Sequence, residues 1–234
     1  MDITKIPGIM RFHGWIAGAS LLDAWFSRAA STAPSYSTPP MLLTMAYVTK
    51  FQRAKNVFDQ AIADKVWVNA AAIKEIANRL RTNGLLPPSS VTSFGDLSKP
   101  VEIVDNEYIN FRVVDSGKSI DSLTASLGAF TFHFAVEGSV GPSSTPGKTR
   151  VEVKKTGIYV VDSFDFNDPP NEDQFLGYWD DSDNAVSSWN PLSGDSVHNS
   201  DFRNWRTKTN MGGDFKVYTD IHVIDLTPPA VFEV

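Results

Sequence analysis

The chain has 234 residues, of which 42% are hydrophobic and 21% are charged, and its formal net charge is −6. This length and apolar content suit a folded protein with a substantial core and argue against global disorder. The sequence has no basic block and no basic helix, so it lacks the electrostatic footprint of nucleic-acid binding. The absence of cysteine excludes disulfides, thiol nucleophiles and thiolate metal sites.

The N-terminal region does not resemble an export signal or a membrane span. Lys5 is followed by a Pro-Gly pair, and the apolar stretch 9–26 is interrupted by charged residues such as Asp23. We therefore expect no transmembrane segment and a cytoplasmic location in the producing cell. Delivery into a target cell would then use a route that needs no cleaved signal.

The first third of the chain predicts helices, because apolar residues recur there at spacings of three and four. We expect three helices, at residues 8–29, 42–63 and 70–81. The segment 31–40 is rich in Ser, Thr and Pro and is typical of a loop. Asn69 is a suitable N-cap for the third helix, and Gly84 lies just past its end.

The aromatic residues Trp15, Trp25 and Phe26 of the first predicted helix are expected to form core. Docking of a partner protein is the alternative for these three side chains. The helical region ends at the Pro-Pro-Ser-Ser run 87–90. We therefore divide the chain into a helical N-terminal region, 1–90, and a mainly β domain, 91–234.

After about residue 95 the hydrophobic pattern changes from the helical period to alternation, which is typical of strands. We expect strands at 101–104, 108–114, 130–136, 151–154, 158–161, 214–219 and 222–224, a turn-rich connection at 138–147, and a short helix at 119–127 with Ser119 as its cap. This order predicts an α+β fold, in which N-terminal helices pack on a mainly antiparallel C-terminal sheet or half-open β-barrel.

The candidate site follows the predicted strand 158–161, which leads directly into Asp162 and Asp165. The Asn-Asp-Pro-Pro run 167–170 must break the strand, and the aromatic pair 178–179 follows. Carboxylates at the end of a strand and beside aromatic residues are a common feature of binding and catalytic sites.

On a continuing strand, the spacing of three places Asp162 and Asp165 on opposite faces, whereas a turn at 163–164 would bring them together. Two close carboxylates could hold a divalent cation such as Mg²⁺ or Ca²⁺, or one could act as a base with a pKa raised by the other. The alternative is that one Asp caps a turn and the other is solvated.

The segment 202–206 mixes arginines with aromatic residues. Arginine can grip a phosphate or a carboxylate at two points, and Trp can stack on a ring. The alternative is that Arg203 pairs with Asp162 or Asp165 and pins a loop to the sheet. The four histidines show no metal-ligand spacing, and His133 is expected to be exposed or packed on the sheet.

Several longer motifs occur along the chain: Ile-Pro-Gly-Ile-Met-Arg at 6–11, Tyr-Val-Val-Asp-Ser-Phe-Asp-Phe-Asn at 159–167, Leu-Gly-Tyr-Trp at 176–179, Asp-Phe-Arg-Asn-Trp-Arg at 201–206 and Gly-Gly-Asp-Phe at 212–215. As a set they resemble the bacterial "domain of unknown function 6402" family over nearly the whole chain. The resemblance implies an accessory protein of type VI secretion loci, with a role in interbacterial competition.

Residues 162–165 also resemble, locally, the Asp-x-Tyr-Asp motif of colicin M-type bacteriocins, which cleave the peptidoglycan precursor lipid II. In those proteins the motif follows a strand of a half-open β-barrel and precedes a His-Arg pair. Here Phe164 stands at the Tyr position and no His-Arg pair follows. The nearest candidates for that pair are His198 and Arg203, which are separated along the chain.

The two resemblances imply an antibacterial effector or toxin that hydrolyses a lipid-linked cell-wall precursor as a metal-assisted phosphodiesterase. In this interpretation Asp162 and Asp165 are catalytic and hold the cation, and Arg203 steadies phosphate charge. The expected substrate-binding residues are Phe164, Trp179, His198, Trp205 and Arg206.

The alternative function is a non-catalytic adaptor, chaperone or immunity-type protein of the same secretion system. Its contact surface would be the aromatic N-terminal helix. In both interpretations the expected partner is a type VI secretion component or a cognate immunity or adaptor protein, and no nucleic acid.

Overall fold

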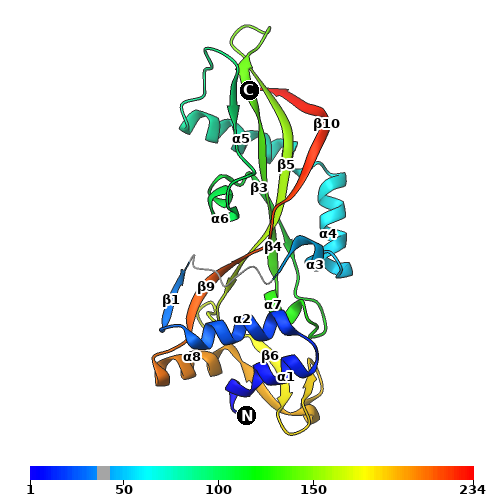
Figure 1. Ribbon diagram of the computed structural model, residues 1–234, viewed down its shortest axis with the longest axis vertical. Helices are drawn as coiled ribbons and strands as arrows, with labels where there is room; N and C mark the ends of the chain where they lie inside the picture. Colours follow the sequence, from blue (N-terminus) through cyan, green and yellow to red (C-terminus); the bar gives the residue numbers. More distant parts are fainter. Residues whose placement is uncertain (36–42) are drawn as a thin grey trace. The chain divides into compact units, whose positions relative to one another are not determined.

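The computed structural model describes residues 1–35 and 43–234, and these form two compact units (Figure 1). Unit 1 comprises Met1–Leu43, Asp115–Phe130 and Val161–Val217, and unit 2 comprises Thr44–Val114, Thr131–Val160 and Tyr218–Val234. Each unit is therefore built from segments that are far apart in the sequence. The ranges 1–90 and 91–234 both contribute residues to both units.

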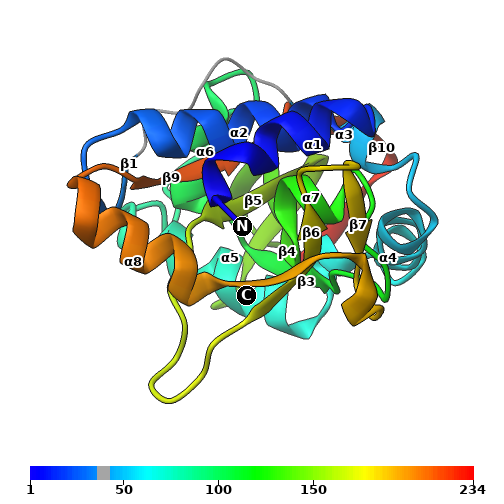
Figure 2. The ribbon, with the colours of Figure 1, turned by 90° about the horizontal axis from the view of Figure 1, so that it is seen from below.

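Unit 1 combines helices with a small antiparallel sheet. Its helices are α1 (Ile6–Phe12), α2 (Ile16–Ser27), α7 (Thr124–Leu127) and α8 (Asn199–Thr209). Its strands are β1 (Ser31–Ser35), β6 (Phe175–Asp180), β7 (Ala185–Ser187), β8 (Asp195–His198) and nearly all of β9 (Gly213–Tyr218). In the small sheet, β6 lies between β7 and β8, and both pairings are antiparallel. Helices α1 and α2 lie side by side (Figure 2).

Unit 2 is dominated by long strands. Its helices are α3 (Met45–Val48), α4 (Gln52–Ala63), α5 (Ala70–Thr82) and α6 (Val101–Val104), and its strands are β2 (Thr92–Phe94), β3 (Asn110–Val114), β10 (His222–Glu233) and most of β4 (Phe130–Pro142) and β5 (Thr149–Phe164). β4 and β5 are neighbours, and β10 and β2 pair antiparallel with β5 and β4, respectively. The last residues of β5, from Val161 on, belong to unit 1, and β9 is the neighbour of β5 in the sheet.

The fold is α+β, as the sequence predicts, with N-terminal helices on a mainly antiparallel sheet. Within unit 2, α4 and α5 contact β3. The ring of Phe58 on α4 lies against Phe132 on β4, with 6.0 Å between the ring centroids. Phe132 is one of the alternate apolar residues predicted to share a face of this strand, and it is fully buried. In unit 1, β1 adds to β9 as a parallel strand.

The predicted helices are partly correct. The single helix expected at 8–29 is wrong, because the chain breaks into α1 and α2 at Gly14, whose φ of +74° is not helical. The helix expected at 42–63 likewise divides into α3 and α4, and residue 42 lies outside the described residues. The third helix is confirmed as α5, and the Asn69 side chain accepts a hydrogen bond from the backbone N–H of Ala72 at 3.0 Å.

Two short elements differ from the prediction. The segment 101–104, expected to be a strand, is the helix α6, in which the backbone N–H of Val104 bonds to the carbonyl of Pro100 at 3.1 Å. The helix expected at 119–127 is limited to α7, and Ser119 is not its cap; the Asp121 side chain accepts from the first N–H of α7, that of Thr124, at 2.8 Å. The segment 31–35, expected to be loop, is strand β1, and 36–40 lies outside the described residues.

The central strands are longer than expected. β4 continues to Pro142, through residues predicted to form a turn, and β5 is one strand in place of the two expected at 151–154 and 158–161. Thr156 is fully buried in β5, and its hydroxyl bonds to the carbonyl of Ala135 at 3.2 Å. β10 continues past the prolines at 228–229, and its register with β5 shifts between Asp225 and Ala230.

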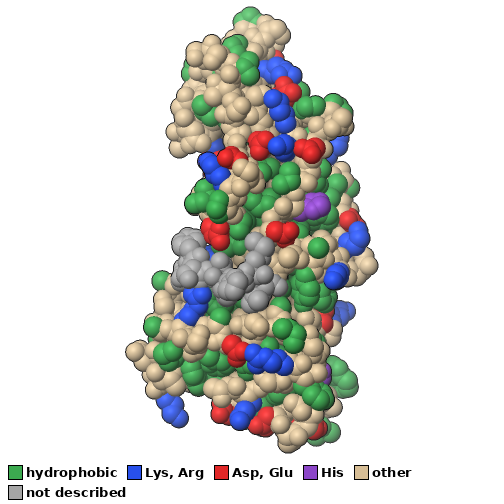
Figure 3. Space-filling view, in the orientation of Figure 1, with side chains coloured by type: hydrophobic (Ala, Val, Ile, Leu, Met, Phe, Trp, Pro, Cys, Tyr) green, Lys and Arg blue, Asp and Glu red, His purple; other side chains and the backbone are tan. Residues whose placement is uncertain are grey.

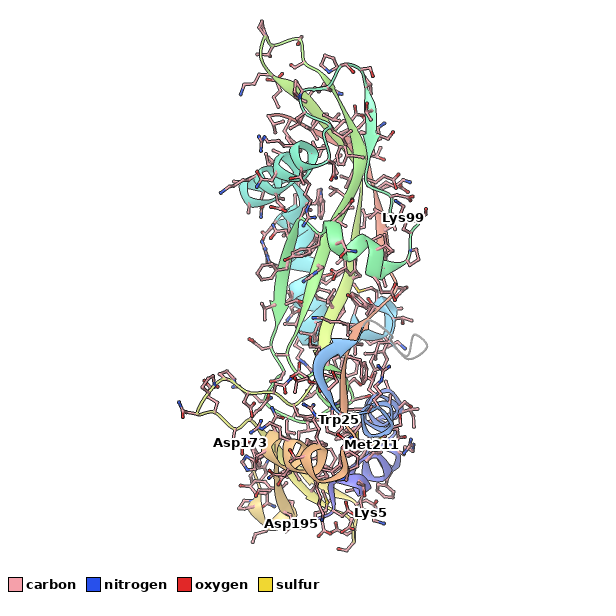
Figure 4. All side chains as sticks on the ribbon, turned by 90° about the vertical axis from the view of Figure 1, so that its left-hand side faces the viewer. Lys5, Trp25, Lys99, Asp173, Asp195 and Met211 are labelled. Carbon is pink, nitrogen blue, oxygen red and sulfur yellow. The ribbon has the colours of Figure 1, made fainter. Side chains whose placement is uncertain are left out.

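The core of unit 1 is built around Trp25, which has no exposed surface. Its indole packs against the rings of Phe26, Phe166, Phe202 and Trp205. The chain approaches it closely just after Met211 (Figure 4), where a Cβ at position 212 would lie 2.5 Å from the Trp25 ring. Docking of a partner through Trp25, the alternative considered for this residue, is therefore wrong, because its side chain is inaccessible.

Candidate functional site

Unit 1 contains a cavity of about 380 Å³ at the end of β5. Its lining comes from the end of β5 and the following turn (162–167), the chain before and through α7 (116–120 and 124–129), the start of β6 (174–177), and Ile6, Met10 and Leu22 of α1 and α2. Apolar and polar groups both contribute to its walls. A cavity of this size and mixed lining suits a small ligand or one end of a larger substrate.

Asp162 and Asp165 both line this cavity. Of the two alternatives considered for this segment, the strand continues, since β5 extends through Phe164 and no turn forms at 163–164. The chain turns instead at the next residue, where Asp165 Oδ1 accepts a hydrogen bond from the backbone N–H of Asn167 at 3.0 Å. The two carboxyl groups therefore share a cavity because the turn follows the strand immediately.

Asp162 is half-buried on the cavity wall, and its carboxyl has a perturbed pKa. Burial raises the pKa of its carboxyl well above the ordinary value of an aspartate, and the nearby charge of Asp165 raises this pKa further. The backbone N–H of Ser163 and the ammonium of Lys216 oppose these effects. A desolvated carboxyl of this kind holds its proton to a higher pH and can donate it to a leaving group.

Asp165 is perturbed in the same direction. Burial raises its pKa, the hydrogen bond from Asn167 opposes this, and the carboxylate of Asp214 raises the pKa again. The charges of Arg206 and Lys216 lower it. Two carboxyl groups with raised pKa values on one cavity can divide the roles of proton donor and proton acceptor.

Ser163 lines the cavity, and Lys216, which is outside its lining, contacts Ser163; sequence reasoning missed both residues. The Lys216 Nζ donates a hydrogen bond to the Ser163 Oγ at 2.8 Å, between the neighbouring strands β9 and β5. Lys216 is the cation that acts on both Asp162 and Asp165. Its role follows from the position of β9 beside β5, which the sequence alone does not give.

Arg203 lies on α8 and does not pair with Asp162 or Asp165, so that predicted pairing is wrong. Its guanidinium forms an ion pair with Asp168, donates to the carbonyl of Phe166 at 2.9 Å, and reaches Asp173 at 3.1 Å. Figure 4 shows Asp173 on the loop after β5, beside α8. Arg203 therefore holds the loop 166–173 on the helix, as a pinning residue would.

The same loop is held by the first turn of α8. The Ser200 backbone N–H and hydroxyl donate to Asp173 at 2.8 Å and 2.6 Å, and the Asn199 amide donates to Asp168 at 2.7 Å. The bond from Ser200 lowers the pKa of Asp173. Burial alone would raise the pKa of Asp168, but the bonds from Arg203 and Asn199 outweigh it and lower this pKa. Both loop carboxylates are thus stabilised as anions.

Arg206 is part of a buried network behind the site. It forms an ion pair with Asp214 and lies over the ring of Trp25, 5.1 Å from the centroid. Asp214 also accepts from Trp25 Nε1 at 2.9 Å and from the amide of Asn167 at 2.8 Å. Because Asn167 lines the cavity, this network fixes the turn that carries Asp165.

The other predicted substrate-binding residues separate into two groups. Phe164 and Trp179 line the cavity, and the ring of Phe164 stacks on Phe215. His198, Trp205 and Arg206 lie outside its lining. His198 precedes α8 with its Nδ1 3.7 Å from Asp173, and the ring of Trp205 packs on Trp25 and Phe26.

The donor set at Asp162 and Asp165 does not fit a divalent cation. Across residues 1–35 and 43–234, no group of three His, Asp or Glu side chains is arranged to hold a metal ion. Among the described residues, only these two carboxyls face the cavity together, and the Lys216 ammonium that acts on both of them repels a nearby cation. These residues are suited to proton transfer and to contact with an anionic group.

Acidic and basic side chains are interspersed over the described residues that Figure 3 displays. Within the described part of the chain, no helix is both long and apolar enough to cross a bilayer.

Comparison with known proteins identifies a family without an assigned activity. The family model described as "Family of unknown function (DUF6402)" matches residues 1–194 and 191–234, so its two matches cover the whole chain. No curated protein and no solved structure gives a significant match. The chain therefore belongs to the DUF6402 family.

Proposed function

We propose that this protein is an antibacterial effector associated with type VI secretion, and that the cavity of unit 1 is a hydrolytic site. The observation that carries the proposal is the position of Asp162, a desolvated carboxyl that lines a cavity together with a second carboxyl, that of Asp165. Such pairs with raised pKa values are typical of acid–base catalysis. The type VI association rests on the family resemblance.

The proposed substrate is a lipid-linked cell-wall precursor, cleaved at a phosphate ester or pyrophosphate bond. The water oxygen attacks phosphorus, and the carboxylate of Asp165 accepts a proton from that water. The carboxylic acid of Asp162 gives its proton to the leaving oxygen. The new P–O bond forms as the old one breaks, and the two carboxyls exchange protonation states. Proton exchange with solvent restores them.

The phosphate-steadying role that the sequence assigned to Arg203 passes in this proposal to Lys216. Arg203 is committed to Asp168 and Asp173, whereas the Lys216 ammonium acts on both cavity carboxyls and reaches Ser163 Oγ. A cation at this position stabilises negative charge that develops on phosphate oxygens. Phe164 and Trp179 supply aromatic surface in the cavity wall.

The test is expression in the periplasm of a susceptible bacterium, combined with hydrolysis of the purified lipid-linked precursor. The wild-type protein is expected to inhibit growth and release soluble phosphate-containing product, and Asp162→Asn is expected to do neither. Asp181→Asn is the matched control, because Asp181 is an exposed carboxylate of the same unit outside the cavity. A toxic Asp162→Asn variant, or a harmless and inactive wild type, contradicts the proposal.

A second candidate function is a non-catalytic adaptor, chaperone or immunity-type protein. It is favoured by two large apolar side chains on α1 and α2, Phe12 and Ile16, which are 69% and 57% exposed. A pull-down from the native host with wild type and with Phe12→Ser/Ile16→Ser tests it. Stoichiometric recovery of a secretion component by the wild type alone, without toxicity, supports this function.

A further inference from the structure

The loop between β7 and β8 presents two large apolar side chains to solvent. Trp189 is 80% exposed and Leu192 is 93% exposed. Exposed Trp and Leu side chains leave a large apolar area in contact with water, so burying either one is favourable. Two such residues within four positions on a single loop indicate a binding surface.

Local hydrogen bonds give this loop a defined shape. The Ser187 hydroxyl accepts from the backbone N–H groups of Trp189 and Asn190 at 3.3 Å and 3.0 Å, and the Asn190 side chain accepts from the N–H of Leu192 at 3.1 Å. At Gly194 the backbone has a φ of +142°, and a Cβ there would lie 2.2 Å from the carbonyl oxygen of Trp179. The two apolar side chains are therefore held outward by an ordered turn.

The loop adjoins the cavity of unit 1. Ser188, which precedes Trp189, lines the cavity, and its hydroxyl donates to the carbonyl of Lys118 at 3.1 Å. Lys118 belongs to the segment 116–120 that forms another part of the cavity wall. Whatever surface binds the loop is thus brought close to the cavity.

We propose that Trp189 and Leu192 insert into the interfacial region of a lipid bilayer and place the cavity at the membrane surface. Trp favours this region because its ring is apolar and its N–H is polar, and Leu favours the acyl chains below. Trp189 and Leu192 stand on a short turn between two strands, and lipid can receive side chains presented in this way without a surface of matching shape.

The charges beside the loop determine the kind of lipid surface. The small sheet that carries the loop has acidic residues at its turns and strand ends, at Asp180, Asp181, Asp183 and Asp195. An anionic surface repels these carboxylates. The binding is therefore apolar in origin, favours zwitterionic lipid, and is insensitive to moderate salt.

The experiment measures partition of the purified full chain into phosphatidylcholine vesicles, by co-sedimentation and by quenching of Trp fluorescence with brominated lipid. We expect Trp189→Ser and Leu192→Ser each to reduce partition about tenfold, and the double variant to abolish it. Val91→Ser is the matched control, since Val91 is a 74% exposed apolar residue of unit 2, and its partition should equal that of the wild type. Added phosphatidylglycerol should weaken binding.

A wild-type protein that does not partition, or loop variants that partition as well as the wild type, overturns the inference. Partition that depends equally on Val91 also overturns it, because binding would then be a general property of exposed apolar residues. All the substituted side chains are exposed, so circular dichroism should show the same fold for every variant.

Delivery of the cavity to a lipid-linked substrate rests on the proposed function, but the membrane contact itself does not. If the hydrolytic function and the membrane contact are both correct, the Trp189→Ser/Leu192→Ser variant loses hydrolysis of the precursor in vesicles. The same variant retains hydrolysis of a water-soluble short-chain analogue. If the proposed function fails, no variant hydrolyses either substrate, and the dependence of vesicle binding on Trp189 and Leu192 remains. The two failures are therefore distinguishable.

Discussion

Lys216 and Ser163 are joined by a hydrogen bond of 2.8 Å between neighbouring strands, and this bond places an ammonium group beside two carboxyls with raised pKa values. The raised pKa values arise chiefly from burial, and Lys216 is the charge that opposes burial at both Asp162 and Asp165. The protonation state of the cavity therefore depends on a residue that lies on a different strand from either carboxyl.

Replacement of Lys216 should shift the titration of the cavity. Lys216 lowers the pKa values of Asp162 and Asp165, so Lys216→Met should raise both, and each carboxyl should keep its proton to a higher pH. The measurement is the carboxyl carbon chemical shift as a function of pH, which needs no activity. Lys208→Met, on the exposed side of α8, should leave both titrations unchanged. Unshifted titrations in Lys216→Met contradict the electrostatic role.

Asp162→Asn should stabilise the protein near neutral pH. Because burial raises the pKa of Asp162 in the folded state, the unfolded chain releases this proton at lower pH than the folded chain does. Below the ordinary pKa of about 4 both states are protonated, and Asp162 has no effect on stability. Between the ordinary pKa and the raised folded-state pKa the unfolded chain is ionised and the folded chain is not, so stability falls as the pH rises across this interval and levels off above it.

The neutral amide removes this effect, so the melting temperature of Asp162→Asn should exceed that of the wild type near neutral pH and equal it in acid. Each unit of pKa shift corresponds to about 1.4 kcal/mol, and 1 kcal/mol changes the melting temperature of a protein of this size by about 2–4 °C. Exposed Asp181→Asn should have no effect at either pH. A stability difference that persists below the ordinary aspartate pKa would show that the amide acts by a means other than removal of the ionisation.

Stability lost to a desolvated carboxyl is typical of a functional site.

Arg203→Met should loosen the loop 166–173 without changing the cavity carboxyls. It removes the ion pairs to Asp168 and Asp173 and leaves the largely buried Asp168 carboxylate without its cation, at a cost of about 2 kcal/mol. Amide hydrogen exchange should accelerate in this loop. Arg150→Met, which removes the exposed pair with Glu152, should leave the stability nearly unchanged. Unchanged exchange in the loop contradicts the pinning role.

Local sequence signals predicted the elements that depend on local interactions. The N-cap of α5 at Asn69 and the buried alternate residues of β4, such as Phe132, were both recognisable, because each depends on neighbours within a few positions. The α8 helix was missed because it has few apolar residues, although His198 and Asp201 form a capping box at its start. The acidic residue Asp201 in the first turn was the available signal.

The remaining errors have non-local causes. The Val-Glu-Ile-Val run 101–104 has strand propensity but forms a helix directly after Pro100. The partners of Arg203 and the role of Lys216 depend on which strands and loops become neighbours, and a linear sequence does not specify this. The two carboxyls were correctly placed at one strand end, but the turn that brings them to one cavity follows Phe164 instead of preceding it.

The buried pair Arg206–Asp214 offers a test of the network behind the site. Arg206→Met leaves the Asp214 carboxylate buried without its cation, and Asp214→Asn leaves the guanidinium buried without its anion. Each single variant should cost about 3–5 kcal/mol, because an uncompensated charge in a desolvated site is strongly unfavourable. In the double variant neither charge remains, while the amide oxygen introduced by Asp214→Asn can still accept from Trp25 Nε1.

The double variant should therefore be destabilised by much less than the sum of the single variants, with a coupling free energy of about 1–3 kcal/mol in a urea-unfolding cycle. The Lys55–Asp59 pair on α4 is the matched control, since both its side chains are about half exposed, and its coupling should stay below about 0.5 kcal/mol. If the changes in unfolding free energy at Arg206 and Asp214 were additive, each residue would stabilise the protein through contacts other than their ion pair. The turn of Asp165 would then be held by Asn167 and Trp25 independently of the ion pair.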